Sequence, residues 1–164
     1  MPSIRFTPMP SSIAAAYRNG EPDAYGCAPE QRLSPGGYQC RHCLAPIAGG
    51  QPYLTVAYRP FPALQPYAET GPIFLHAMKC TAYDGGDRLP PIFDSPDYIV
   101  RGYGHDDRIV YGTGAVTPTS EIAARAKTLL QDENIAYVHV RSARNNCFQC
   151  RIERVTAEKH LPEG

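Results

Sequence analysis

The sequence lacks an excess of charge of either sign, because 16 Lys and Arg residues balance 16 Asp and Glu residues among its 164 residues. No run of Lys and Arg forms a basic stripe, so the usual electrostatic signature of nucleic-acid binding is missing. No window approaches the roughly 20 consecutive apolar residues of a membrane-spanning helix. Residues 1–5 also lack the apolar stretch of a secretory signal peptide. We therefore expect a cytoplasmic protein that binds neither nucleic acid nor a membrane.

Cysteine, by contrast, occurs six times, and its redox state decides what these residues can do. Thiols stay reduced in the cytoplasm. We therefore interpret the cysteines as metal ligands, nucleophiles or small core residues rather than as a disulfide framework. They are Cys27, Cys40, Cys43, Cys80, Cys147 and Cys150.

Proline is abundant, with 17 residues, and it separates short apolar segments by irregular loops. Segments rich in β-branched and aromatic residues predict strands, at residues 4–7, 53–58, 72–78, 98–103, 108–116, 135–142 and 147–155. Most connections between successive strands are too short for a parallel crossover. We therefore predict a single α+β domain over residues 1–164, with a largely antiparallel sheet of barrel-like form.

Two helices are predicted beside this sheet. A short N-terminal helix covers residues 13–18. One long helix covers residues 118–131, where Thr117 provides the N-cap and Pro118 occupies the first helical position. Its apolar residues repeat at helical spacing and predict a stripe that packs on the sheet, made of Ile122, Ala126, Leu129 and Leu130.

The last two predicted strands allow a prediction of their register. For both sets of alternating apolar residues to face the core, Val140 must pair with Phe148 and Val138 with Cys150. That register leaves a three-residue loop at residues 143–145, a length that hairpins favour. Cys150 then becomes a core cysteine. The opposite, polar face carries Tyr137, His139, Arg141, Cys147, Gln149 and Arg151.

Two pairs of residues predict a zinc site. A C-x-x-C turn delivers two thiolates from one tight loop, and zinc prefers four soft or borderline ligands in a tetrahedron. A histidine and a cysteine four residues apart lie on one side of the chain in a strand or in a helix. The predicted Cys₃His ligand set is Cys40, Cys43, His76 and Cys80. The alternative is two unrelated features, a reduced C-x-x-C loop and a core histidine and cysteine.

The polar face of the last hairpin is a second candidate site. Cys147 and His139 could form a thiolate–imidazole pair, with Arg141 lowering the pKa of the thiol or holding an oxyanion. Arg101 and Tyr103 share one face of an earlier strand and would extend the same pocket. The alternative is an ordinary solvent-facing side of a sheet, which carries similar residues. No nucleophile signature surrounds the cysteine.

Three motifs can be compared with known families. They are Cys40-Arg41-His42-Cys43-Leu44, the segment Tyr67-Ala68-Glu69-Thr70-Gly71-Pro72-Ile73-Phe74 with His76, and Tyr137-Val138-His139-Val140-Arg141 followed by Cys147-Phe148. Together they resemble the bacterial "domain of unknown function 1203" family over nearly the whole chain. The resemblance implies a small stand-alone bacterial protein, and it implies no activity, substrate or catalytic residue.

Three functions from different classes follow. The leading interpretation is a cytoplasmic protein with a structural zinc, because four protein ligands leave the metal no open position. The second is an enzyme whose catalytic residues are Cys147, His139 and Arg141. The third is a metal-free binding or scaffolding domain that offers its polar sheet face to a partner or a small ligand. The sequence identifies neither substrate nor partner.

Overall fold

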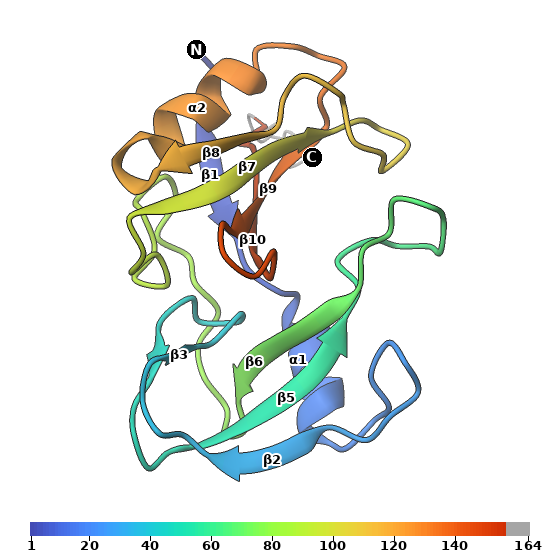
Figure 1. Ribbon diagram of the computed structural model, residues 1–164, viewed down its shortest axis with the longest axis vertical. Coiled ribbons are helices and arrows are strands. Elements are labelled where there is room, and N and C mark those ends of the chain that lie inside the picture. The colour runs from blue at the N-terminus through green and yellow to red at the C-terminus, as the bar shows by residue number, and fades with distance from the viewer. Residues whose placement is uncertain (157–164) are drawn as a thin grey trace, which may run out of the picture.

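The computed structural model describes residues 1–156, whose strands form three antiparallel sheets. The five-stranded sheet has the order β1 (Ile4–Thr7), β10 (Phe148–Arg154), β9 (Tyr137–Ser142), β7 (Asp97–Tyr103) and β8 (Ala115–Pro118). The three-stranded sheet has the order β2 (Glu30–Leu33), β5 (Pro52–Tyr58) and β6 (Gly71–His76). A small ladder joins β3 (Tyr38–Gln39) to β4 (Pro46–Ile47). In Figure 1 the five-stranded sheet lies in the upper part of the molecule and the three-stranded sheet in the lower part.

The antiparallel pairing is confirmed, but the barrel-like form is wrong. The five-stranded sheet ends in the edge strands β1 and β8, so it is open. The predicted strand at residues 108–116 is also misplaced, since β8 covers Ala115–Pro118 and pairs Ala115 with Val100. Between β7 and β8 a single isolated bridge joins Tyr103 to Ile109 within the described chain. Three sheets, of five, three and two strands, replace the single sheet that was predicted.

The long helix predicted at residues 118–131 is wrong in length. Pro118 has φ −53° and ψ 138°, so it is extended and ends β8 rather than beginning a helix. A 3₁₀ turn, η1 (Thr119–Glu121), precedes the shorter α2 (Ile122–Leu129). The hydroxyl of Thr117 donates to Ala115 O and caps no helix. The predicted apolar stripe is nevertheless buried, with Ile122, Ala126, Leu129 and Leu130 all 8% exposed or less.

The short helix is confirmed as α1 (Ser11–Arg18), which begins two residues before the predicted start. The two helices pack in different hydrophobic cores. The α2 core packs α2 on one face of the five-stranded sheet, and it includes Val100, Val138, Val140, Cys150 and Ile152. The α1 core joins α1 to the three-stranded sheet, and it includes Ala14, Leu54, Val56, Leu75 and Phe148. No helix of residues 1–156 is long and apolar enough to cross a membrane.

The register of the last hairpin is a further correction. Cys150 pairs with Val140 and Ile152 with Val138, so the predicted pairing is shifted by two residues. A β-bulge between Phe148 and Cys150 breaks the strict alternation on which the prediction depended. The bulge keeps Cys150 in the α2 core, where it is fully buried as predicted, and it turns Phe148 to the α1 core.

The bulge has a consequence for the polar face of this hairpin. Phe148, 5% exposed, brings the α1 core against the face of β9 that carries His139. His139 and Arg141 are only 1% and 4% exposed. The polar face of the hairpin is therefore buried at these two positions, and the alternative of an ordinary solvent-facing side does not hold there.

Candidate metal centre

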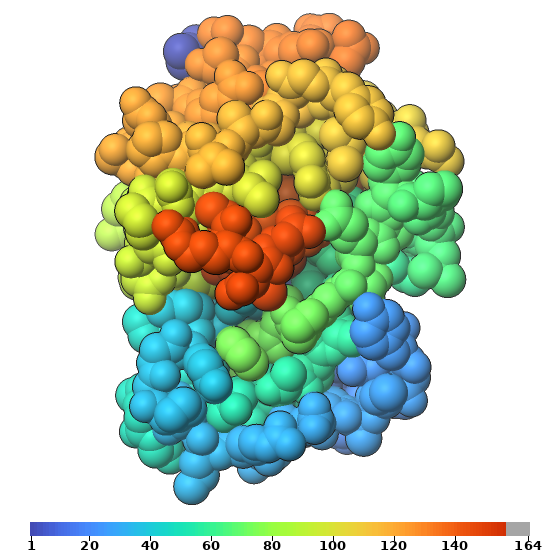
Figure 2. Space-filling view, viewed as in Figure 1, coloured from blue at the N-terminus to red at the C-terminus, as the bar shows by residue number. Residues whose placement is uncertain are grey.

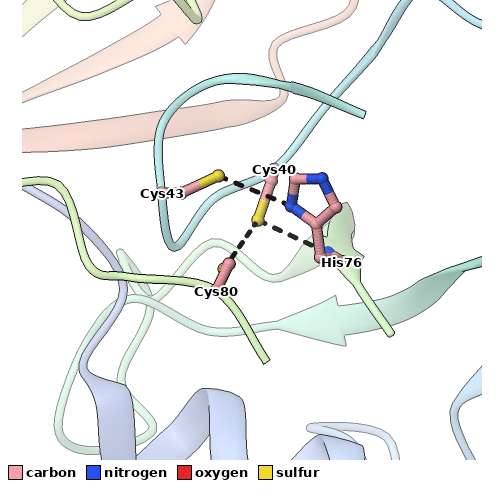
Figure 3. Close-up of side chains that lie close together, drawn as sticks. All are labelled: Cys40, Cys43, His76 and Cys80. Carbon is pink, nitrogen blue, oxygen red and sulfur yellow. Dashed lines mark hydrogen bonds between the residues drawn. The ribbon is translucent and has the colours of Figure 1, made fainter. Parts of the chain in front are cut away.

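Local backbone geometry brings the two cysteines of the C-x-x-C turn together. Cys40 follows β3, and its N–H donates to Ala45 O at 2.9 Å. The chain then folds back so that Leu44 N–H donates to Cys40 O at 3.0 Å. Leu44 has a positive φ of 54°, a conformation uncommon for a branched apolar residue. This tight turn points the side chains of Cys40 and Cys43 to the same side (Figure 3).

The other two residues come from a different part of the chain. His76 is the last residue of β6, and Cys80 lies four residues later in an irregular segment. The N–H of His76 donates to Cys40 Sγ at 3.4 Å, which fixes the end of β6 against the C-x-x-C turn. The structure therefore brings together all four residues predicted as a set, Cys40, Cys43, His76 and Cys80.

The distances among the four side chains fit one shared metal ion. All four donor atoms lie within 4.8 Å of one another. Two thiolates on a tetrahedral zinc lie about 3.8 Å apart, and a thiolate and an imidazole nitrogen about 3.6 Å apart, given Zn–S bonds of about 2.3 Å and Zn–N bonds of about 2.0 Å. Cys40 Sγ and Cys80 Sγ are 3.9 Å apart, and Cys43 Sγ and His76 Nδ1 are 3.4 Å apart. The first distance is also far longer than the roughly 2.05 Å of a disulfide.

The electrostatics of the turn favour negative charge at Cys40. The pKa of its thiol is lowered to about 4, because Cys43 and the N–H groups of the turn and of His76 donate to its sulfur. The neighbouring Cys40 sulfur raises the pKa of Cys43. Burial, together with the charge of Cys40, raises the pKa of Cys80. Three thiols crowded in this way release their remaining protons most readily when a metal cation binds to them.

Two residues that the sequence did not single out as ligand partners, Arg18 and His42, contact Cys80 Sγ, and Ser11 contacts His42. Arg18 Nη2 donates to Cys80 Sγ at 3.0 Å, and Arg18 Nε donates to His76 O at 3.0 Å. His42 Nδ1 lies 3.1 Å from the same sulfur, and its Nε2 lies 2.9 Å from the hydroxyl of Ser11. With Nδ1 protonated, His42 donates to the sulfur of Cys80 and accepts from the serine hydroxyl. No spacing rule could have shown these contacts, since 62 residues separate Arg18 from Cys80.

Within the C-x-x-C turn, Arg41 links the site to the rest of the molecule. This side chain is 4% exposed. Its Nε donates to Phe148 O and its Nη1 to Gln39 O, both at 2.7 Å. The turn that carries two of the four candidate ligands is thus attached to β10 of the five-stranded sheet.

The second candidate site is arranged differently from the expectation. Arg141 pairs with Phe148 rather than with Cys147, and the imidazole of His139 is enclosed by aromatic rings. Within residues 1–156, Cys147 Sγ has one hydrogen-bond contact, with Asn145 O at 3.8 Å, and none with His139. Register does place Arg101 beside His139 on one sheet face, as expected. A catalytic role for Cys147, His139 and Arg141 stays a prediction.

Glu69 connects the segments of this second region. Its Oε1 accepts from Arg101 Nη2 at 2.6 Å, and its Oε2 accepts from Asn146 Nδ2 at 2.9 Å. Arg141 Nη1 lies 3.6 Å from Oε2. In Figure 2 the orange-red segment that precedes and begins β10 lies next to the green segment before β6, and the hydrogen bond of Asn146 to Glu69 joins these two segments. The carboxylate therefore ties the long loop before β6 to β7 and β9.

Comparison with known proteins gives one match. The family described as "Protein of unknown function (DUF1203)" matches residues 37–154. That range contains all four members of the Cys₃His cluster. No curated protein and no solved structure matches the chain.

Proposed function

Because the chain belongs to the DUF1203 family, whose description assigns no activity, we propose its function from the site itself: a zinc-binding protein with a structural ligand set of Cys40, Cys43, His76 and Cys80. The observation that carries the proposal is the convergence of four donor atoms within 4.8 Å, with two of their separations, 3.9 Å and 3.4 Å, close to the edge lengths of a zinc–ligand tetrahedron.

Zinc is the metal that this donor set favours. Three thiolates and one imidazole are soft or borderline ligands, which select zinc over the hard cations Mg²⁺ and Ca²⁺. Three thiolates and Zn²⁺ together leave one net negative charge. The guanidinium of Arg18 on Cys80 Sγ offsets that charge. The contact of Arg18 with Cys80 supports an anionic metal–thiolate centre rather than a cluster of neutral, metal-free thiols.

The connections of the site support a structural role. Four protein ligands fill a tetrahedron and leave no position for a substrate. The metal would join the C-x-x-C turn to the end of β6 and to the segment after it. Arg18 adds α1 to this group, and Arg41 adds β10. A single ion would thus fix the relative positions of segments far apart in the sequence.

Metal analysis by mass spectrometry tests the proposal, on protein purified without a His-tag or added metal. Wild type is expected to carry about one zinc per chain and Cys80→Ser much less, because three remaining ligands bind zinc more weakly. Cys27→Ser is the matched control, since Cys27 is exposed and lies outside the cluster. Wild type without metal, or Cys80→Ser with the full wild-type content, would contradict the proposal.

Arg18→Gln is expected to weaken zinc binding about tenfold, because residues that hold a ligand in place typically contribute 10–100-fold to metal affinity. The substitution removes the charge that lies 3.0 Å from Cys80 Sγ. Competition with a chromophoric chelator measures the affinity. Arg32→Gln is a suitable control, because Arg32 is an exposed arginine whose ion-pair partner is the exposed Glu30. Equal affinities for the two variants would show that Arg18 has no part in the site.

A further inference from the structure

A pocket of about 330 Å³ lies between the two main sheets, apart from the metal centre. Its walls include Tyr58, Pro60, Phe61 and Phe148, and His139 forms part of its lining. The volume lies within the range of about 300–1,000 Å³ that small-molecule sites occupy, and such sites are mostly apolar with a few polar groups.

His139 is a polar residue of the pocket lining whose hydrogen-bonding groups are left without a partner. The residue is 1% exposed, and neither of its ring nitrogens has a hydrogen-bond partner within residues 1–156. Aromatic rings enclose the imidazole, with centroids 4.8–5.1 Å away at Tyr103, Phe148, Tyr137 and Phe61. A buried polar group without a partner costs about 1–3 kcal/mol, so native structures usually supply one. A ligand in the pocket would do so.

The protonation state of His139 specifies the kind of group that would satisfy it. Burial lowers the pKa of this imidazole well below its ordinary value, and the charges of Arg141, Arg151 and Arg101 lower it further. The ring is therefore neutral at physiological pH, with one N–H donor and one nitrogen acceptor. A hydroxyl group matches either nitrogen, because it both donates and accepts.

The rim of the pocket carries positive charge. Arg59 lines it, and none of the ion pairs formed within residues 1–156 involves Arg59. Its Nε donates to Phe61 O, which leaves the rest of the guanidinium available. Arg151, also at the rim, is paired with Glu153, and Glu153 is shared with Arg5. One unpaired guanidinium at the entrance favours a ligand with a single negative charge.

We propose that this pocket binds a small hydroxylated aromatic carboxylic acid. The ring lies between the walls formed by Phe61 and Phe148, the hydroxyl reaches His139 at the inner end, and the carboxylate pairs with Arg59 at the rim. The apolar walls, the neutral unpartnered imidazole and the unpaired arginine each account for one part of that molecule. The proposal is independent of the metal centre, which lies outside the pocket lining.

Nuclear magnetic resonance of the full chain with ¹⁵N-labelled histidine tests the proposal directly, with 4-hydroxybenzoate as the probe. The ring ¹⁵N signals of His139, assigned by their loss in His139→Gln, are expected to shift and saturate during the titration. Benzoate lacks the hydroxyl, and 4-hydroxybenzyl alcohol lacks the carboxylate. Each of these two compounds is expected to bind at least about tenfold more weakly than 4-hydroxybenzoate.

Arg59→Gln separates the two contacts. The substitution is expected to weaken 4-hydroxybenzoate about tenfold while the weaker binding of 4-hydroxybenzyl alcohol stays unchanged. If no histidine ring ¹⁵N signal of wild type responds to 4-hydroxybenzoate, the proposal is overturned, whether or not any variant folds. Equal affinities for 4-hydroxybenzoate and benzoate would overturn the role of His139. If Arg59→Gln bound 4-hydroxybenzoate as tightly as wild type does, the proposed pairing of Arg59 with the carboxylate would be overturned.

Discussion

Cys40→Ser is expected to remove the metal and to lower the free energy of unfolding by at least about 4 kcal/mol, the stabilisation that a ligand provides at 1,000 times its Kd. Cys40 is fully buried, and its sulfur contacts Cys80 Sγ and the N–H of His76. A serine hydroxyl is a poor zinc ligand, and it leaves the other thiols without the shared cation. Urea denaturation followed by circular dichroism measures the change.

A chelator distinguishes loss of the metal from damage to the core. Chelation is expected to lower the free energy of unfolding of wild type nearly to that of Cys40→Ser and to leave the variant unchanged. Cys27→Ser should respond to the chelator as wild type does, because Cys27 lies outside the cluster. Wild type that loses zinc without losing stability would show that the metal is not structural.

Glu69→Gln is expected to lower the free energy of unfolding by about 2–3 kcal/mol, somewhat less than the 3–5 kcal/mol of a fully buried ion pair. The expected loss is smaller than for a fully buried pair because solvent screens the carboxylate. The Glu69 side chain is 33% exposed, whereas those of Arg101 and Arg141 are 17% and 5% exposed. Removing the carboxylate leaves two largely buried guanidinium groups without a counter-charge. The same denaturation experiment measures the effect.

The matched control for this substitution is Glu30→Gln. Glu30 and Arg32 form an ion pair in which both side chains are about 60% exposed, and exposed pairs contribute about 0–1 kcal/mol. The control should therefore stay close to wild type. If Glu69→Gln destabilised the protein no more than Glu30→Gln, the contacts of Glu69 with β7 and β9 would not hold the loop before β6 in place.

The sequence determined the elements whose signal is local. Residues 53–58 are confirmed as part of β5, because β-branched and aromatic side chains suit an extended, half-buried chain. The stripe Ile122, Ala126, Leu129 and Leu130 is buried as predicted, although its helix is shorter. The C-x-x-C turn and its pairing with His76 and Cys80 were also predicted from spacing, and the four residues do meet. The single domain over residues 1–164, the cytoplasmic location and the absence of nucleic-acid binding stay predictions.

Tertiary structure alone decided the features that depend on distant contacts. A bulge at Phe148 changed the register of the last hairpin, and alternation cannot reveal a bulge because each residue still fits a strand locally. Phe61 and Phe148 then covered His139, so that part of the polar face of the hairpin became the lining of a pocket. The contact of Arg18 with Cys80 likewise arises only when α1 packs beside the turn. Local sequence thus specified which residues could form a metal site, while packing between distant segments determined which charges surround these residues and where a separate pocket lies.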